Sequence, residues 1–285
     1  MNLDGLRVQA RAAAEAAGRF IALRRPEAVE HKAAGGESPA SQVVTEVDRA
    51  SEAMIVEALE ASRRAHGLGL LTEERDDDGS RLSAPAFWCI DPLDGTLAYV
   101  EGVPGSSVSI ALVAQDGTPL LGVVHDITRG VTLHASQDSG VWLDDAPWSM
   151  PTPAAGLRLY GDRSHRDDAR YEVLAEGLRA PGPLTVEFGR AAATNAWAAI
   201  EQPAAAYAKL PKSGRGGGST WDFAATACIV QQAGGVATAF NGEPLRLNEP
   251  HTTFFNGTGV LFASSAAAAA MVQRAWGGSS SFQAG

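Results

Sequence analysis

Residues 88–99 read WCIDPLDGTLAY, and the stretch carries two carboxylates, Asp91 and Asp94, where a short apolar segment ends. The residues from Phe87 to Ile90 predict a buried strand. We expect this strand to stop at Pro92, because proline has no N–H group to donate to a sheet ladder. The chain therefore places a pair of acidic side chains at the end of a strand.

The residues that follow this pair suit a phosphate. Gly95 allows the backbone to turn sharply and to approach a ligand closely. Thr96 offers a hydroxyl group and can begin a helix, whose free N–H groups favour an anion. Carboxylates combined with a carbonyl and a phosphate are the oxygen ligands that Mg²⁺ prefers. A turn stabilised by aspartate side chains is the alternative interpretation of these residues taken alone.

The overall composition excludes several classes of protein. The 285 residues are 45% hydrophobic and 20% charged, as is typical of a soluble globular protein with a sizeable core. The formal net charge of -10 disfavours a nucleic-acid polymer or an anionic membrane as a partner and is compatible with a site that collects cations. No apolar run reaches the length of a membrane span, and no basic stretch precedes an apolar one at the N-terminus, so we expect a cytoplasmic protein. Cys89 and Cys228 lie in apolar segments and are expected to be buried thiols, with a disulfide as the alternative.

The first half of the chain predicts helices followed by a series of strands. Apolar spacing indicates a helix at residues 3–24, and a second helix begins at Thr45 with Asp48 as its capping partner. Beyond the acidic turn, strands are expected at 107–113, 120–125, 131–135 and 140–143. Three prolines at positions 147, 151 and 153 then indicate a boundary between two lobes.

Strands and helices alternate in the second half. Strands are expected at 157–160 and 184–188, and helices at 167–178, 191–200 and 220–233. The last of these helices follows a glycine-rich loop at 214–218 and ends at Gly234 and Gly235. Residues 277–285 are small and polar and are predicted to be disordered.

A second acidic signal lies at the start of the last predicted helix, in the sequence WDFAA at residues 221–225. Trp221, Ala225 and Cys228 share one apolar face, so the helix is expected to pack against a sheet. Asp222 falls in the first turn, where the helix dipole favours a carboxylate. Simple N-terminal capping is the alternative role for this aspartate.

Taken together, these motifs resemble the inositol monophosphatase family of Mg²⁺-dependent, lithium-sensitive phosphatases, which includes the bisphosphate nucleotidases. The two principal matches are DPLDGT at 91–96 and WDFAA at 221–225, the latter continuing to a glycine pair. Three further matches follow the family's order: residues 72–74 (TEE), residues 44–48 (VTEVD) and the segment 256–264.

The resemblance implies a fold and an assembly. The fold is a mixed α/β structure, a layered α-β-α-β-α sandwich of the sugar-phosphatase type with two lobes. Residues 1–152 would form an α+β lobe that carries most metal ligands, and residues 153–276 an α/β lobe that completes the metal and substrate site. Members of this family are usually homodimers, so a homodimer is expected here.

The resemblance also assigns roles at the predicted site. Two or three Mg²⁺ ions would be held by carboxylates and one carbonyl, with Mn²⁺ as a substitute and Li⁺ or Ca²⁺ as inhibitors. The ligands would be Glu73, Asp91, Asp94 and Asp222, with the carbonyl of Leu93. Glu73 and Thr96 would orient the attacking water, while Asp48 would accept a hydrogen bond from the Thr96 hydroxyl. The N–H groups of Gly95 and Thr96 would bind the phosphate.

Substrate recognition is where this chain departs from the family pattern. Arg215 stands where true inositol monophosphatases carry an acidic residue, and QPAAAY at 202–207 lacks the family's aspartate, so acceptors for sugar hydroxyls are missing. Residues 162–165 (DRSH) resemble a segment of the bisphosphate nucleotidases that lies near the nucleotide, although LA at 97–98 replaces the Lys-Glu pair often found in that branch.

The predicted substrate contacts are therefore Ser164, His165 and Arg215. Lys209 and Lys212 would suit a second phosphate or simply form a solvated basic loop. Lys32 resembles a loop lysine that approaches the metals in related enzymes, with a solvated loop as the alternative.

The function that these residues predict is a Mg²⁺-dependent phosphomonoesterase acting on a small phosphorylated polyol or sugar, in the simplest case myo-inositol monophosphate. A 3′(2′),5′-bisphosphate nucleotidase and a histidinol phosphatase are the alternatives within the same chemistry. A catalytically silent regulator that binds phosphorylated ligands is the alternative from another class, and the presence of all four carboxylates argues against it. The expected partner is a small phosphate ester, without nucleic-acid polymer or membrane.

Overall fold

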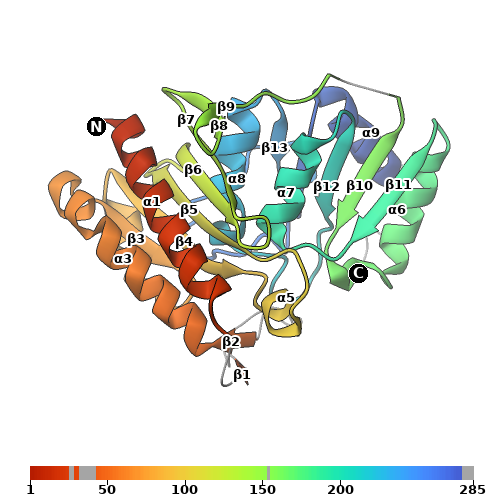
Figure 1. Cartoon of the computed structure of the whole chain (residues 1–285). Helices are drawn as coiled ribbons and strands as arrows, with labels where there is room; N and C mark the ends of the chain where they lie inside the picture. The colour runs from red at the N-terminus through yellow and green to blue at the C-terminus, as the bar shows by residue number, and fades with distance from the viewer. Residues whose placement is uncertain (26–28, 32–42, 153–154, 278–285) are drawn as a thin grey trace.

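Two large β-sheets, a separate two-stranded sheet and three layers of helices make up the structure, a computed structural model that describes residues 1–25, 29–31, 43–152 and 155–277 (Figure 1). Within these residues, one sheet has seven strands in the order β3-β4-β5-β6-β7-β8-β9, and the other has five in the order β11-β10-β12-β14-β13. The larger sheet comprises β3 (Gly69–Thr72), β4 (Ala86–Asp94), β5 (Ser107–Ala114), β6 (Pro119–Asp126), β7 (Val131–Ser136), β8 (Gly140–Leu143) and β9 (Ala146–Pro147). The smaller comprises β10 (Leu157–Gly161), β11 (Leu184–Phe188), β12 (Ala205–Lys209), β13 (Val236–Thr238) and β14 (Val260–Ala263). The short strands β1 (Val29–His31) and β2 (Val43–Thr45) pair separately.

The helices form layers on and between the sheets. α1 (Leu3–Ala22) and α3 (Glu46–His66) cover one face of the larger sheet, and α7 (Ala192–Glu201) and α8 (Thr220–Gln232) fill the space between the two sheets. α6 (Ala169–Arg179) and α9 (Ala266–Gly277) cover the far face of the smaller sheet. The short elements are α4 (Ser80–Ser83), α5 (Thr96–Glu101) and the 3₁₀ turn η1 (Arg163–His165). This order confirms the expected α-β-α-β-α sandwich.

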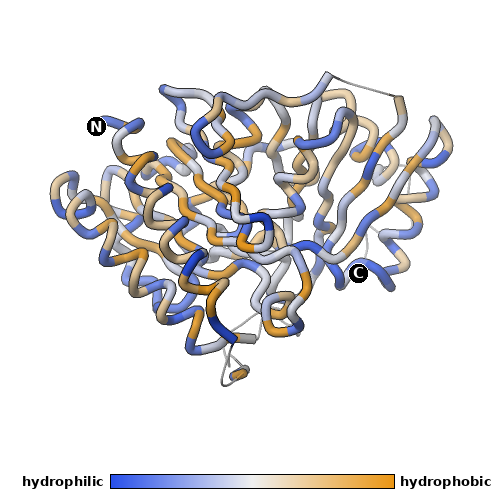
Figure 2. The backbone as a smooth tube through the Cα atoms, viewed as in Figure 1, coloured by the Kyte–Doolittle hydropathy of each residue, from blue (hydrophilic) through white to orange (hydrophobic). Residues whose placement is uncertain are grey.

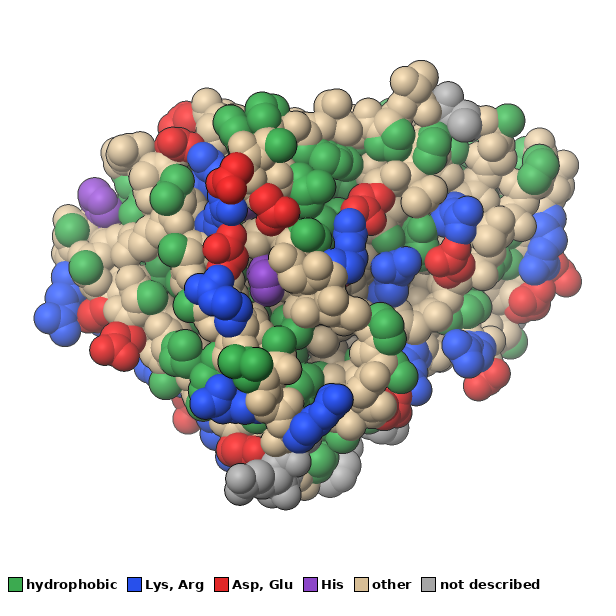
Figure 3. Space-filling model, in the orientation of Figure 1, with side chains coloured by type: hydrophobic (Ala, Val, Ile, Leu, Met, Phe, Trp, Pro, Cys, Tyr) green, Lys and Arg blue, Asp and Glu red, His purple; other side chains and the backbone are tan. Residues whose placement is uncertain are grey.

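Burial of apolar side chains on both sides of the central helices stabilises this stacking. One core cluster joins Phe87 of β4 to Phe223 of α8 and to Phe262 of β14, so it runs from one sheet through the helix layer to the other. Hydrophobic and hydrophilic residues alternate along the outer helices α1 and α3, as expected for helices with one buried face (Figure 2). Acidic and basic side chains are interspersed on the face shown in Figure 3.

The strand of the acidic turn differs from the prediction. β4 continues past Pro92 to Asp94, so the expectation that it stops at the proline was wrong. Its pairing with β5 shifts from Asp91 opposite Ser109 to Asp94 opposite Ser107, which leaves Pro92 and its neighbour in a bulge. A bulged residue need not donate to the ladder, so a proline is tolerated there. The bulge increases the bend of the strand between its two aspartates.

The other predicted strands and helices of the first and second halves match the structure to within two residues at each end. The elements that were not predicted are β1, β2, β3, β9, β12, β13, the short elements α4 and η1, and helix α9. The two cysteines are buried free thiols, which excludes the disulfide alternative. Among the described helices, none combines the length and apolarity needed to span a bilayer. The predicted disordered tail lies outside the described residues beyond Gly277.

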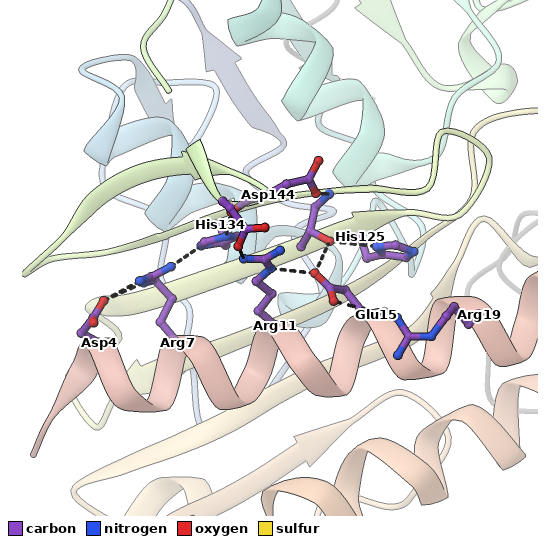
Figure 4. A network of polar contacts seen from close by, with 10 residues as sticks. Asp4, Arg7, Arg11, Glu15, Arg19, His125, His134 and Asp144 are labelled. Carbon is purple, nitrogen blue, oxygen red and sulfur yellow. Dashed lines mark hydrogen bonds and ion pairs between the residues drawn. The ribbon is translucent and has the colours of Figure 1, made fainter. Parts of the chain in front are cut away.

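A buried polar network, rather than apolar packing alone, joins α1 to strands β6 and β7 (Figure 4). The guanidinium of Arg7 donates to the Nδ1 atom of His134 at 2.5 Å, and Nε2 of the same ring lies 2.9 Å from the carbonyl oxygen of Asp144. One turn further along, Glu15 accepts hydrogen bonds from Arg11 and from the hydroxyl of Thr132. Because Arg7 occupies Nδ1 as a donor, His134 is held as the neutral tautomer protonated on Nε2.

Burial, opposed in part by the Asp144 carbonyl, lowers the pKa of His134 to about 4. An unfolded chain, whose histidines titrate near pH 6.5, therefore binds a proton at higher pH than the folded protein does. The folded state consequently loses stability as the pH falls from 6.5 to about 4, by about 3 kcal/mol from this residue.

The prediction is that His134→Gln, which can still accept from Arg7 and donate to Asp144, unfolds with a smaller loss of stability between pH 7 and pH 5 than the wild type. Urea unfolding at the two pH values measures the difference, and the carboxylates shared by both proteins cancel in the comparison. Equal losses in the two proteins would show that His134 is not the titrating group.

Candidate active site

A cavity of about 1100 Å³ lies where the carboxyl ends of β3 and β4 meet the first turns of α5 and α8 and the end of β12. Segments from both halves of the chain line it, from Leu71 to Asp77 on one side and from Arg215 to Asp222 on the other. The acidic turn at 91–96 forms part of its wall. The two motifs that lie far apart in the sequence thus face one space.

Three carboxylates converge in this cavity. Asp91, Asp94 and Asp222 each offer an oxygen atom, and these atoms all lie within 4.8 Å of one another. The first two flank the bulge of β4, and the third lies in the first turn of α8. The predicted ligands from the two halves of the chain are therefore brought together.

Each carboxylate is held by backbone N–H groups. Asp91 accepts from Leu93 at 3.1 Å, Asp94 accepts from Ala193 at the start of α7 at 2.8 Å, and Asp222 accepts from Ser219 at 2.7 Å. The last of these bonds confirms the capping role considered for Asp222, which therefore caps α8 and faces the cluster at once.

The electrostatics of the cluster favour a cation. Burial, reinforced by repulsion among the neighbouring carboxylates, raises the pKa of Asp91 and of Asp94 well above the ordinary value. Burial likewise raises the pKa of Asp222. A divalent ion would remove both the repulsion and the cost of burying charge. Because the donors are carboxylate oxygens, and Leu93 lines the same cavity, the residues present fit Mg²⁺ or Mn²⁺.

Thr96 and Asp48 form the predicted pair. The Thr96 hydroxyl lies 2.8 Å from a carboxylate oxygen of Asp48 and 3.2 Å from the carbonyl of Leu93. The other oxygen of Asp48 accepts from the N–H and the hydroxyl of Thr45, at 2.9 and 2.6 Å. Asp48 therefore caps α3 and holds Thr96 simultaneously, so both of its predicted roles coexist.

Glu73 lies at the cavity but outside the group of three. Its backbone N–H donates to the carbonyl of Ile90 at 3.2 Å, which ties the end of β3 to β4. After burial, the charge of Glu73 is the largest influence that raises the pKa of Asp91, so its carboxylate acts on the cluster. The structure thus places this predicted ligand beside the cluster rather than within it.

The predicted phosphate and substrate residues all line the cavity. Gly95 has a φ of +86°, and a Cβ atom there would lie 2.7 Å from the Cβ of Ala191, so only glycine fits this turn. His165 is buried and stacks on Tyr171, with ring centroids 5.0 Å apart, and its Nδ1 atom has no hydrogen-bond partner among the described residues. Ser164 and Arg215 are exposed at the rim, where the Arg215 guanidinium lies 4.8 Å from the ring centroid of Phe254.

The glycine-rich loop packs against the start of α8. Gly218 has a φ of +78°, and a Cβ atom there would lie 2.8 Å from a carboxylate oxygen of Asp222 and 2.4 Å from the ring of Phe223. The loop can approach the metal-site helix this closely because it carries no side chain at that position. Lys32 lies outside the described residues.

An ion pair that the sequence did not predict lies in the cavity. The Lys209 ammonium lies 2.6 Å from Asp162, whose other oxygen accepts from the Tyr207 hydroxyl at 2.7 Å. Burial opposes the charge of Lys209, but Asp162 and Asp222 outweigh it, so the pKa of Lys209 is raised. The signal that could have revealed this pair is topological, since β10 and β12 are parallel neighbours whose carboxyl ends meet.

Comparison with known proteins points to one family. The model of the inositol monophosphatase family matches residues 2–277. The inositol-1-monophosphatase of Synechocystis sp. is 33% identical over 230 residues, which cover 76% of this chain and 74% of that protein. The Nus factor SuhB of Escherichia coli (strain K12) is 30% identical over 245 residues, 81% of this chain and 83% of that protein. The crystal structure of extragenic suppressor protein suhB from Bartonella henselae covers 97% of this chain and 98% of its own, with 22% identity and a TM-score of 0.73, so the fold is shared.

The carboxylate cluster makes a testable prediction about metal and stability. Asp94→Asn keeps an oxygen acceptor for Ala193 but removes one of the clustered charges. We expect the metal-free variant to melt at the same temperature as the metal-free wild type or higher, because repulsion is relieved. We also expect it to lose most of the increase in melting temperature that Mg²⁺ gives the wild type. Thermal melts in EDTA and in Mg²⁺ measure both effects, and an unchanged Mg²⁺-dependent shift would contradict the assignment of Asp94 as a ligand.

Proposed function

The chain belongs to the inositol monophosphatase family, and on this premise we propose that it is a Mg²⁺-dependent phosphomonoesterase acting on a small phosphorylated polyol or sugar. The observation that carries the proposal is the convergence of Asp91, Asp94 and Asp222 beside the Thr96–Asp48 pair. A catalytically silent binding protein would have no need for a carboxylate cluster combined with a hydroxyl group held beside it. Our best candidate for the substrate is myo-inositol monophosphate.

The residues of the chain divide the work of hydrolysis. Divalent ions held by the three aspartates, the Leu93 carbonyl and Glu73 would supply positive charge to the phosphate and lower the pKa of a water molecule. Thr96 donates its only hydroxyl proton to Asp48, which leaves its oxygen lone pairs free to accept a hydrogen bond from the attacking water.

Asp48 makes the Thr96 oxygen a better acceptor, because hydrogen bonds in a chain polarise one another. Glu73 is the second acceptor for the water, and the N–H groups of Gly95 and Thr96 are the donors for the phosphate oxygens. Water displaces the alcohol from phosphorus directly, so the products are inorganic phosphate and the free alcohol. No enzyme residue becomes phosphorylated in this scheme.

The proposal is tested by phosphate release with purified protein. We expect Mg²⁺-dependent release from myo-inositol monophosphate, abolished by EDTA, inhibited by Li⁺ or Ca²⁺, and reduced at least about a thousandfold in Asp222→Asn because a metal ligand is weakened. The panel includes adenosine 3′,5′-bisphosphate, histidinol phosphate and fructose 1,6-bisphosphate. Failure to release phosphate from any of these esters with Mg²⁺ or Mn²⁺ would overturn the enzyme assignment and favour the silent regulator.

A set of cations at the cavity favours a second candidate, a 3′(2′),5′-bisphosphate nucleotidase. Arg190, Lys212 and Arg215 line the cavity, and none of them forms an ion pair with a described residue. Lys209 adds a buried ammonium at the same wall. Unpaired cations beside the metal cluster suit a substrate with a second anionic group, and they offer fewer acceptors for the hydroxyl groups of a polyol. A histidinol phosphatase has no comparable support.

The variant Arg215→Gln distinguishes between the two candidate functions. If a second phosphate contacts Arg215, the variant lowers kcat/KM for adenosine 3′,5′-bisphosphate about tenfold or more, which is the effect of losing one charged hydrogen bond, and leaves the value for myo-inositol monophosphate nearly unchanged. Arg64→Gln, at an exposed position of α3 outside the cavity lining, is the matched control. Equal values for wild type and variant with both substrates would remove Arg215 from the substrate site.

Assembly and cellular location stay predictions. A homodimer is the expected assembly, and sedimentation of the purified protein would measure it. A small phosphate ester is the proposed partner, and the cytoplasm is the proposed location.

A further inference from the structure

The first turns of α3 hold both walls of the active site. Asp48, Ser51 and Glu52 are spaced to lie on one face of the helix, and all three are buried. Asp48 holds Thr96, as described above, and the Ser51 hydroxyl donates to the carbonyl of Pro92 at 2.9 Å. The bulged segment that carries the aspartates is therefore attached to this helix at two points.

Glu52 reaches the opposite wall, the turn that follows β3. One of its oxygens accepts the backbone N–H of Glu74 at 2.9 Å, and the other accepts Nε of Arg75 at 2.6 Å. The Glu52 side chain is only 3% exposed, whereas Arg75 is 47% exposed. The backbone hydrogen bond is thus the shielded part of this contact, and the ion pair is its solvent-facing part.

We propose that Glu52 is a positioning residue that fixes the turn at 73–75 and thereby aims the carboxylate of Glu73 at the metal cluster. The backbone of Glu73 is held on one flank by its own N–H bond to Ile90 and on the other by the bond from Glu74 to Glu52. With both flanks fixed, the main chain at Glu73 has little freedom to turn. The direction in which the Glu73 side chain leaves the backbone is therefore fixed. The inference rests on the proposed metal-dependent function, since it concerns how the fourth carboxylate is presented to a metal.

A buried carboxylate is an expensive way to pack a helix. Burying the charge of Glu52 costs stability that an apolar side chain would not cost, and the half-exposed Arg75 offsets only part of it. What the carboxylate provides, and an apolar residue cannot, is an acceptor for the Glu74 N–H at a defined place. Removing a group that orients a metal ligand without itself binding the metal commonly lowers the metal affinity about 10- to 100-fold.

Helix α3 therefore connects the two walls of the active site. Asp48 and Ser51 set the position of the 92–96 segment, and Glu52, one helical turn from Asp48, sets the position of Glu73. Since all three side chains project from one helix, α3 supports the nucleophile-orienting residues Thr96 and Glu73 from a single rigid element, in addition to the pairing of β3 with β4.

The test is a set of Mg²⁺ binding isotherms by calorimetry, read together with circular dichroism and melting temperature. We expect Glu52→Leu to weaken Mg²⁺ binding about tenfold or more and Glu52→Gln, which can still accept from Glu74, to weaken it less. Glu57→Leu introduces the same change on the exposed face of α3 and is expected to bind Mg²⁺ like the wild type.

A double-mutant cycle with Glu73→Gln shows whether Glu52 acts through Glu73. If it does, adding Glu52→Leu to Glu73→Gln weakens Mg²⁺ binding no further. Additive losses, or Glu52 variants that bind Mg²⁺ like the wild type, would overturn the proposal. Metal binding with no turnover on any ester would contradict the proposed function and leave the positioning role intact. Absence of Mg²⁺ binding by the wild type would overturn both.

Discussion

Mutual repulsion among three clustered carboxylates, two of them buried and one half-buried, is the constraint on which the rest of this structure depends. Asp91, Asp94 and Asp222 would move apart if their backbones were free, because like charges held within 4.8 Å of one another and largely removed from solvent are costly. Each is instead tied to a backbone N–H group, in the β4 bulge, at the start of α7 and at the cap of α8. The stacking of the two sheets with the helix layer between them brings the β4 bulge, the start of α7 and the cap of α8 together. All three of these hydrogen bonds can therefore form at once.

Polar contacts from α1 and α3 complete the support from the opposite face of the larger sheet. α3 holds the acidic turn through Asp48 and Ser51, and α1 is joined to the neighbouring strands through buried side chains such as Arg7 and His134. Such networks are less forgiving than apolar packing, since removing one member leaves its partner buried and unpaired. Through His134, the network makes the fold less stable in acid than at neutral pH.

Much of this architecture could be read from local patterns. The apolar segments at 107–113 and 120–125, joined through a turn that contains Gly117 and Pro119, predict two successive strands, and the structure confirms them as β5 and β6, which pair antiparallel. The three aspartates were found from the turn at 91–96 and from the first helical turn at Asp222, where local chemistry is distinctive. The strand end at Pro92 was predicted wrongly, because a bulge is a property of two paired strands and is invisible in one of them. The ion pair of Lys209 with Asp162 and the bond from Glu74 to Glu52 depend on tertiary contacts between segments far apart in the chain.

The central claim is that the three aspartates hold divalent metal, and anomalous diffraction from crystals grown with Mn²⁺ tests it most directly. We expect at least one anomalous peak within coordinating distance, about 2.1–2.3 Å, of oxygens from Asp91, Asp94 and Asp222, with the Glu73 carboxylate turned toward a peak. The same crystals grown with EDTA should lack the peak. Full-occupancy Mn²⁺ elsewhere on the molecule, with none at these aspartates, would contradict the claim.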